Sequence, residues 1–190
     1  MDTEDFLARL LPHRLNSLAI TVLMLEFRLE WEEPKSMQIY VEGRIQFEGM
    51  TSLFMNPILE AGALHARAPL EFLGLKSNTG KLVQLDSRQK DDVGIERFAS
   101  RSGPLSLVTP KQARDAYPVN TALAEAVLAA IIVAANKGMA HSSASYFSNP
   151  LDANQALLAC RLIQELVQTY LYTPLGRQRP PIPVEARARE

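Results

Sequence analysis

Residues 12–31 read PHRLNSLAITVLMLEFRLEW, and this segment decides the fold class that we expect. Its apolar side chains recur three and four residues apart, which is the spacing of a helix. Apolar residues also fill the other faces, and a helix that is apolar nearly all round is surrounded by protein. Pro12 suits the first turn, where an N–H has no helical partner. The sequence therefore predicts a central helix from Pro12 to about Trp31.

Other segments carry similar helical signals, and we find no alternation of useful length that would indicate a strand. The apolar residues between Ile39 and Phe54 fit a helix better than a strand, with Ser36 as its cap and a restart or kink at Asn56-Pro57. The helices expected beside the central one cover residues 3–11, 36–75 and 122–138, and a last helix runs from Asn149 or Asp152 to about Tyr170. Thr3 is the expected cap of the first of these helices, and Asn120 or Thr121 is the expected cap of the helix over residues 122–138. The predicted fold is an all-α bundle of about five main helices, with residues 1–172 as one domain and residues 173–190 as a flexible tail that contains Pro and Arg.

A polar stretch from Lys76 to Pro110 is expected to form a long surface connection. Asp91 or Asp92 is a candidate cap for a short helix from Val93 to Phe98. Thr109 followed by Pro110 is a second capping signal.

Composition excludes several classes. A hydrophobic fraction of 47% and a charged fraction of 22% are ordinary for a globular protein, so wholesale disorder is excluded. A net charge of -1 gives no global attraction to nucleic acid, which leaves RNA as a weakly supported partner. The acidic first residues do not resemble an export signal, and no apolar run reaches the roughly 20 residues that a membrane-spanning helix needs. We expect a cytoplasmic protein without membrane contact, whose single cysteine, Cys160, is a buried apolar side chain.

Motifs for metal and cofactor binding are missing from the sequence. The histidines are His13, His65 and His141, and none has a second histidine or cysteine at the spacing of a metal site. Glycine-rich phosphate loops and the GxSxG elbow of serine hydrolases are also missing. We expect neither a metal nor a cofactor.

Three short polar segments are candidates for a common site. They contribute His65, Arg67, Glu71, Asp91, Asp92, Asn136, Lys137 and His141. Each segment also has a local explanation: Arg67 can pair with Glu71 four residues on, the aspartates can cap a helix, and Lys137 with His141 can offset a helix dipole. A bundle is nevertheless able to draw them into one polar cluster, and this is our prediction.

The same segments carry a resemblance to a known family. They are His65-Ala-Arg67, Leu70-Glu71-Phe72-Leu73, Asp91-Asp92-Val93, Asn136-Lys137 and Ala140-His141. Over about residues 50–145 the chain resembles the HEPN domains of toxin–antitoxin and defence systems. The resemblance implies an α-helical bundle, often dimeric, whose active members cut RNA without a metal by means of an Arg and a His that are separated by four to six intervening residues.

This sequence departs from the HEPN motif at its arginine. His141 matches the histidine, but the window before it holds Ala134, Ala135 and Asn136, and Lys137 lies one step too close. Lysine also lacks the bidentate fork with which arginine holds phosphate. We therefore expect a non-catalytic, HEPN-like binding or regulatory module that acts through protein contacts.

We expect this module to be a homodimer because of the resemblance and the surplus of apolar helix surface. Two other functions stay open. One is a metal-independent ribonuclease that uses His141 with Lys137 and Arg67. The other is a bundle that binds a metal or a small molecule through His65, Asp91, Asp92 and His141.

Overall fold

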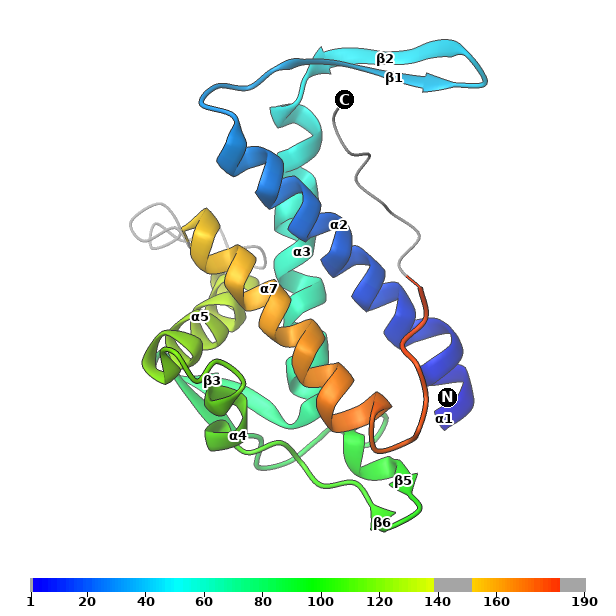
Figure 1. Cartoon of the computed structure of the whole chain (residues 1–190), viewed down its shortest axis with the longest axis vertical. Helices are drawn as coiled ribbons and strands as arrows, with labels where there is room; N and C mark the ends of the chain where they lie inside the picture. Colours follow the sequence, from blue (N-terminus) through cyan, green and yellow to red (C-terminus); the bar gives the residue numbers. More distant parts are fainter. Residues whose placement is uncertain (1, 139–151, 182–190) are drawn as a thin grey trace.

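The fold mixes helices with short antiparallel sheets (Figure 1). The computed structural model describes residues 2–138 and 152–181. Of these described residues, 58% lie in helices and 15% in strands, and the strands form three sheets of two strands each. The prediction of an all-α fold was therefore wrong.

The N-terminal helical region is continuous from Thr3 to Glu30. It consists of α1 (Thr3–Asp5), a π-helical turn η1 (Phe6–Leu10) and α2 (Leu11–Glu30). The carboxylate of Asp2, in place of the expected Thr3, caps it by accepting the Asp5 N–H at 2.7 Å. Pro12 lies in the first turn of α2, and Trp31 marks the C-terminal cap, as the sequence predicted.

The other main helices are α3 (Ser52–Leu73), α5 (Thr121–Val133) and α7 (Ala153–Val167). Helix α5 continues into the π-helical turn η3 (Ala134–Gly138), and α7 continues into η4 (Gln168–Tyr172). Of the alternatives that the sequence left open, Asn120 caps α5 and Asp152 caps α7. The predicted cap Thr109 is confirmed, with a full capping box at the start of α4 (Pro110–Asp115).

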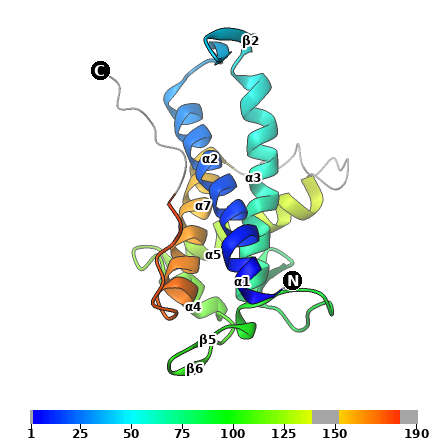
Figure 2. The same cartoon turned by 90° about the vertical axis from the view of Figure 1, so that its right-hand side faces the viewer.

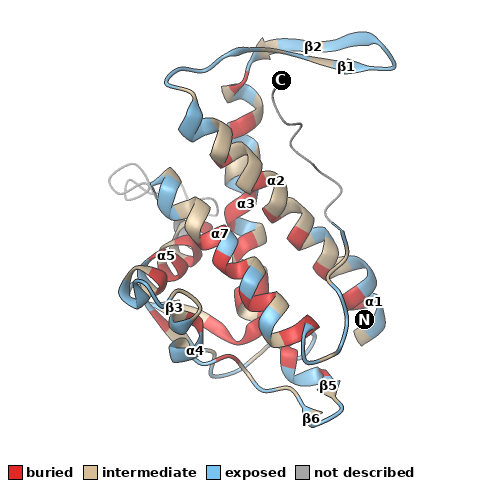
Figure 3. Ribbon diagram, viewed as in Figure 1, coloured by how far each residue is buried: buried red, intermediate tan, exposed pale blue. Residues whose placement is uncertain are grey.

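The core lies where α2, α3, α5 and α7 pack together (Figures 1 and 2). Buried residues concentrate on these helices, as Figure 3 shows, and Cys160 in α7 is among them, which confirms its prediction. Gly62 in α3 faces the buried Thr21 in α2, and a β-carbon at Gly62 would lie only 3.0 Å from the Thr21 Cβ. The missing side chain at Gly62 thus sets how closely α2 approaches α3.

The first sheet is a hairpin that stands at the far end of α2 and α3 (Figures 1 and 2). It pairs β1 (Ser36–Val41) with β2 (Arg44–Met50), in a segment for which the sequence predicted a helix. Glu42 and Gly43 adopt φ values of 50° and 76° between the strands. Two successive residues with positive φ make the turn whose twist matches a hairpin, and a helix cannot pass through them.

The segment predicted as a polar surface connection contains two more hairpins. They are formed by β3 (Leu75–Asn78) with β4 (Lys81–Gln84) and by β5 (Ala99–Ser100) with β6 (Gly103–Pro104). Between them lies the 3-10 turn η2 (Ile95–Arg97), which begins without a side-chain cap. The prediction that Asp91 or Asp92 caps a helix here was therefore wrong.

The start of the predicted tail is held against the helices. Arg177 forms two hydrogen bonds to the Glu4 carboxylate, at 2.9 and 3.0 Å, and Arg179 donates to Gln164 at 2.9 Å. Within the described ranges no helix is long and apolar enough to cross a bilayer.

Candidate functional site

Arg67 and Glu71 form the local pair that the sequence allowed. The Arg67 Nε donates to the Glu71 Oε1 at 2.7 Å along one face of α3. The Glu71 carboxylate, one helical turn after Arg67, is thus the ionic partner of the Arg67 guanidinium. This arrangement supports the local explanation for Arg67.

His65 contacts two residues of α2 that the sequence analysis did not select. The Arg14 guanidinium donates to His65 Nδ1 at 3.2 Å, and the His13 and His65 rings lie 5.2 Å apart, edge to face. A nitrogen that accepts from arginine carries no proton, so His65 is neutral with its proton on Nε2. Partial burial, and then the charges of Arg14 and His13, lower the pKa of His65 below its usual value.

These three side chains, His13, Arg14 and His65, form a basic cluster between α2 and α3. It places a neutral imidazole, which can transfer a proton, beside a permanent positive charge, which can hold an anion. The signal for it was present in the sequence, since His13 and Arg14 are adjacent on the predicted central helix. Nothing in the sequence indicated that α3 would bring His65 to the same height.

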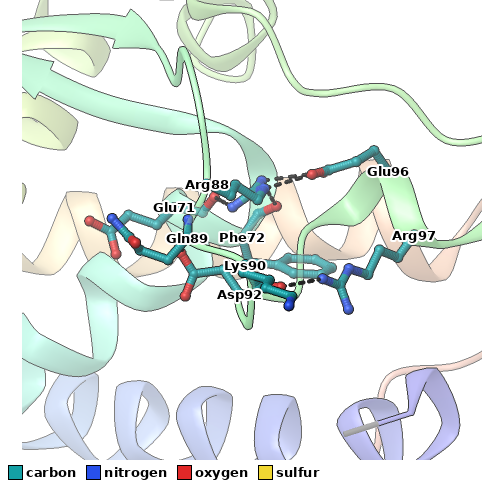
Figure 4. Close-up of polar contacts among 8 residues, drawn as sticks. All are labelled: Glu71, Phe72, Arg88, Gln89, Lys90, Asp92, Glu96 and Arg97. Carbon is teal, nitrogen blue, oxygen red and sulfur yellow. Dashed lines mark hydrogen bonds and ion pairs between the residues drawn. The ribbon is translucent and has the colours of Figure 1, made fainter.

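Asp91 and Asp92 belong to a loop that is closed by a different residue, Arg88. Arg88 donates to the backbone carbonyls of Glu71 and Phe72, at 2.6 and 2.9 Å, and to both Glu96 carboxylate oxygens, at 2.7 and 3.3 Å (Figure 4). Its side chain is only 13% exposed. The Asp92 carboxylate accepts the Gln89 N–H at 3.0 Å within the loop, and Asp91 is exposed.

The Arg88 network ties the predicted cluster's middle segment to the end of α3. Carbonyls at a helix C-terminus lack partners within the helix and carry partial negative charge, so a cation that caps them stabilises the end. Arg88 therefore holds the loop that contains Asp92 against the end of α3, where Glu71 lies. This link between the two predicted segments has a structural role.

The third predicted segment is described only in part. Asn136 lies in η3, which packs against α3, and its buried side-chain oxygen has no hydrogen-bond partner among the described residues. Of Lys137 only the backbone is described, and His141 lies outside the described residues. The contacts of His141 and of the Lys137 side chain are therefore not described, and their place in the predicted polar cluster stays a prediction.

A second feature is a set of exposed apolar side chains on the hairpin and on the adjoining ends of α2 and α3, which we call the hairpin-end surface. It consists of large apolar side chains that are 42% to 62% exposed: Leu29, Tyr40, Val41, Ile45, Met50 and Leu53. Figure 3 shows the hairpin largely in the colour of exposed residues, in contrast to the bundle. Phe47 of β2 packs edge to face on Phe54 of α3, at 4.4 Å between ring centres, and this contact anchors the hairpin.

A hollow lies at the base of the hairpin, between Trp31 and Thr51. Its cavity volume is about 10 Å³, which is roughly the room for one water molecule. Residues 2–138 and 152–181 also contain no group of three or more His, Cys, Asp or Glu side chains able to hold a metal ion.

The chain matches no model of a known family, and neither a curated protein nor a solved structure is significantly similar to it. Its function must therefore be inferred from its own residues.

Proposed function

We propose that this chain is a non-catalytic binding module that acts through protein contacts, with a second copy of itself as the expected partner. The hairpin-end surface is the observation that carries this proposal. Tyr40 on the hairpin is 58% exposed to water, and Leu53 at the start of α3 is 62% exposed. Burial of such apolar side chains against a partner would stabilise a complex. Apolar and aromatic side chains gathered in this way are typical of protein interfaces.

The state of the predicted catalytic residues supports the same proposal. Arg67, the arginine available to the ribonuclease interpretation of the HEPN-like resemblance, is engaged with Glu71 at 2.7 Å. The hollow at the hairpin base is too small for a metabolite. Exposed apolar side chains on a projecting hairpin fit a regulatory role that acts through protein contacts better than an enzyme.

The test is the solution mass of the wild-type chain and of matched variants. We expect light scattering at tens of micromolar to give a mass of twice 21.1 kDa. Tyr40→Thr with Ile45→Thr removes apolar surface but keeps residues that favour strands, and it should shift the mass to that of one chain.

Val119→Thr is the matched control for these variants. Val119 is 86% exposed and precedes α5, away from the hairpin. If the dimer rests on the hairpin-end surface, this control keeps the mass of the wild type. A wild-type mass of 21.1 kDa at all concentrations would argue against self-association, and equal loss of mass in both variants would argue against the hairpin-end surface.

The Arg14–His65 hydrogen bond favours a second candidate, metal-independent RNA cleavage at the basic cluster in place of His141 and Lys137. There His65 would transfer the proton and Arg14 would steady the phosphate. Cleavage of a labelled RNA in excess chelator, lost in His65→Gln and Arg14→Gln at unchanged melting temperature, would support it. Unaltered RNA with the wild-type chain would exclude it.

A further inference from the structure

The hairpin has too few strands to account for its own stability. An isolated pair of strands is at best marginally stable in water, and at least three strands or a supporting helix are normally needed. Here the anchoring contact is that of Phe47 with Phe54, near the base. The apolar side chains of Tyr40, Val41 and Ile45 lie further out and stay exposed.

The free edge of β1 can be located from its hydrogen bonds. Lys35 and Thr51 bond to each other at 2.8 and 3.0 Å, so the backbone N–H and C=O of Lys35 point towards the β2 side. Backbone groups alternate in direction along an antiparallel strand. Those of Ser36, Gln38 and Tyr40 therefore point outward, and β1 has β2 as its one strand neighbour in the described chain.

The two edges of the hairpin differ in how well they are protected. The register shifts in the middle of the hairpin, where Ile39 is opposite Phe47 and Tyr40 is opposite Ile45, so Gln46 of β2 is an extra, bulged residue. A bulge bends an edge and opposes further pairing. Strand β1 from Ser36 to Val41 contains no bulge, proline or charged residue. It is the edge that is free to accept another strand.

We propose that β1 pairs antiparallel with β1 of a second copy, with the two-fold axis at Ile39, to give a four-stranded sheet across the dimer. Ile39 then lies opposite Ile39 of the second copy, and Met37 lies opposite Val41. On the other face Gln38 lies opposite Tyr40. The outward backbone groups of Gln38 and Tyr40 bond to their counterparts, and the apolar pairs occupy the closely spaced positions between these bonds. This inference rests on the proposed function.

Symmetry and the matching of apolar side chains select this register. A two-fold axis perpendicular to the sheet keeps each side chain on its own face, so the axis can pass through a residue but not between two residues. With the axis at Ile39, each of Met37, Ile39 and Val41 lies opposite an apolar side chain of the second copy. With the axis at Gln38, Lys35 would lie opposite Val41, and with the axis at Tyr40, Met37 would lie opposite Gly43.

Disulfide crosslinking in the full chain tests this inference. Burial raises the pKa of Cys160, the native cysteine, to about 12, so it does not react at pH 8 and an introduced cysteine reports alone. At Ile39 the two Cα atoms would lie about 4.5 Å apart, within the range of a disulfide. Under mild oxidation Ile39→Cys should form a covalent dimer at least about tenfold faster than Gln38→Cys or Tyr40→Cys alone, whose diagonal separation of about 7–8 Å is too long.

A mixture of Gln38→Cys and Tyr40→Cys chains is the matched control, because these positions face each other across the proposed axis. In an equal mixture about half of the dimers pair one variant with the other, so the yield of covalent dimer should be about half that of Ile39→Cys. If light scattering shows a dimer but crosslinking does not follow this pattern, the β1 edge is not the interface while the proposed self-association stands. A wild-type chain that stays monomeric, with no crosslink from Ile39→Cys, overturns both.

Discussion

At the scale of single residues, the close approach of α2 and α3 depends on the absence of a side chain at Gly62. A β-carbon there would overlap the side chain of Thr21, which is itself held by a 2.8 Å hydrogen bond to the Ser17 carbonyl. We expect Gly62→Ala to lower the free energy of unfolding by about 1–3 kcal/mol, because the helices must move apart or Thr21 must leave its rotamer. Urea denaturation followed by circular dichroism measures this change.

The control for this prediction is the double variant Thr21→Ala with Gly62→Ala. Removing the Thr21 hydroxyl and methyl relieves most of the overlap, although the two β-carbons still lie 3.0 Å apart. The double variant should therefore recover part of the stability that Gly62→Ala loses. Additive losses in the two single variants would show that the overlap with Thr21 is not the cause.

His65 gives the chain a pH-dependent stability of known sign. Burial and the charges of Arg14 and His13 lower its pKa in the folded state, while the unfolded state keeps the usual value near 6.5. Below pH 6.5 the unfolded chain therefore binds more protons, and stability falls as the pH drops towards the folded pKa. Stability at pH 7.5 and above should be insensitive to this group.

The comparison with His65→Gln isolates this effect from other acids and bases. The Gln side-chain oxygen can still accept from Arg14 but does not titrate, so the difference in unfolding free energy between the two chains should change between pH 7.5 and 5. A difference that stays constant over this range would show that the pKa of His65 is the same in both states.

At the scale of elements, the end of α3 depends on a residue that is distant in sequence. Arg88 donates to the carbonyls of Glu71 and Phe72 and also to Glu96, while Gly94 leaves the room for its guanidinium. We expect Arg88→Lys to destabilise the chain by about 1–3 kcal/mol, because an ammonium group keeps the charge but cannot serve three acceptors in one plane. Thermal unfolding of the two chains measures the loss.

Arg97→Lys is the matched control for Arg88→Lys. Arg97 belongs to the same loop but is exposed and donates to the Lys90 carbonyl at 3.3 Å. Its replacement should change stability by less than about 0.5 kcal/mol. Equal losses in the two variants would contradict the role assigned to the Arg88 network.

Elements with strong local signals could be predicted from the sequence, and the others could not. Asn120 and Asp152 cap helices with their own side chains, so neighbouring residues were enough to narrow each cap to two candidates. Residues 36–50 have apolar side chains at spacings compatible with either a helix or a strand, and Glu42-Gly43 is a weaker turn signal than Asn-Gly. The hairpin depends on Thr51 closing its base and on Phe54, and these contacts exist only after folding.

The same distinction applies to the candidate site. The pair of Arg67 with Glu71 is four residues apart on one helix and could be predicted. The contact of His65 with Arg14 spans 51 positions, and its formation depends on the height at which α3 packs against α2. Arg88 likewise has no local sequence signal, because its acceptors are backbone carbonyls that every helix end presents.

At the scale of the whole molecule, the chain separates a buried end from an exposed one. The helices α2, α3, α5 and α7 hold most of the buried side chains, whereas the hairpin contributes none that is fully buried among the described residues. The bundle therefore supplies the folding free energy, and the hairpin is available for binding. This division predicts that the hairpin can be removed without unfolding the bundle.

The bond between Lys35 and Thr51 gives a design for that removal. The Lys35 C=O accepts the Thr51 N–H at 2.8 Å, so a two-residue Asn-Gly turn can join these positions in place of residues 36–50. In dilute solution we expect the shortened chain to keep its helical circular dichroism and to lose only about 0.5–1.5 kcal/mol, roughly the Phe47–Phe54 contact. Its mass by light scattering should be that of one chain at concentrations at which the full chain is a dimer. A shortened chain that stays dimeric would move the interface to the helices, and one without cooperative unfolding would show that the hairpin is part of the core.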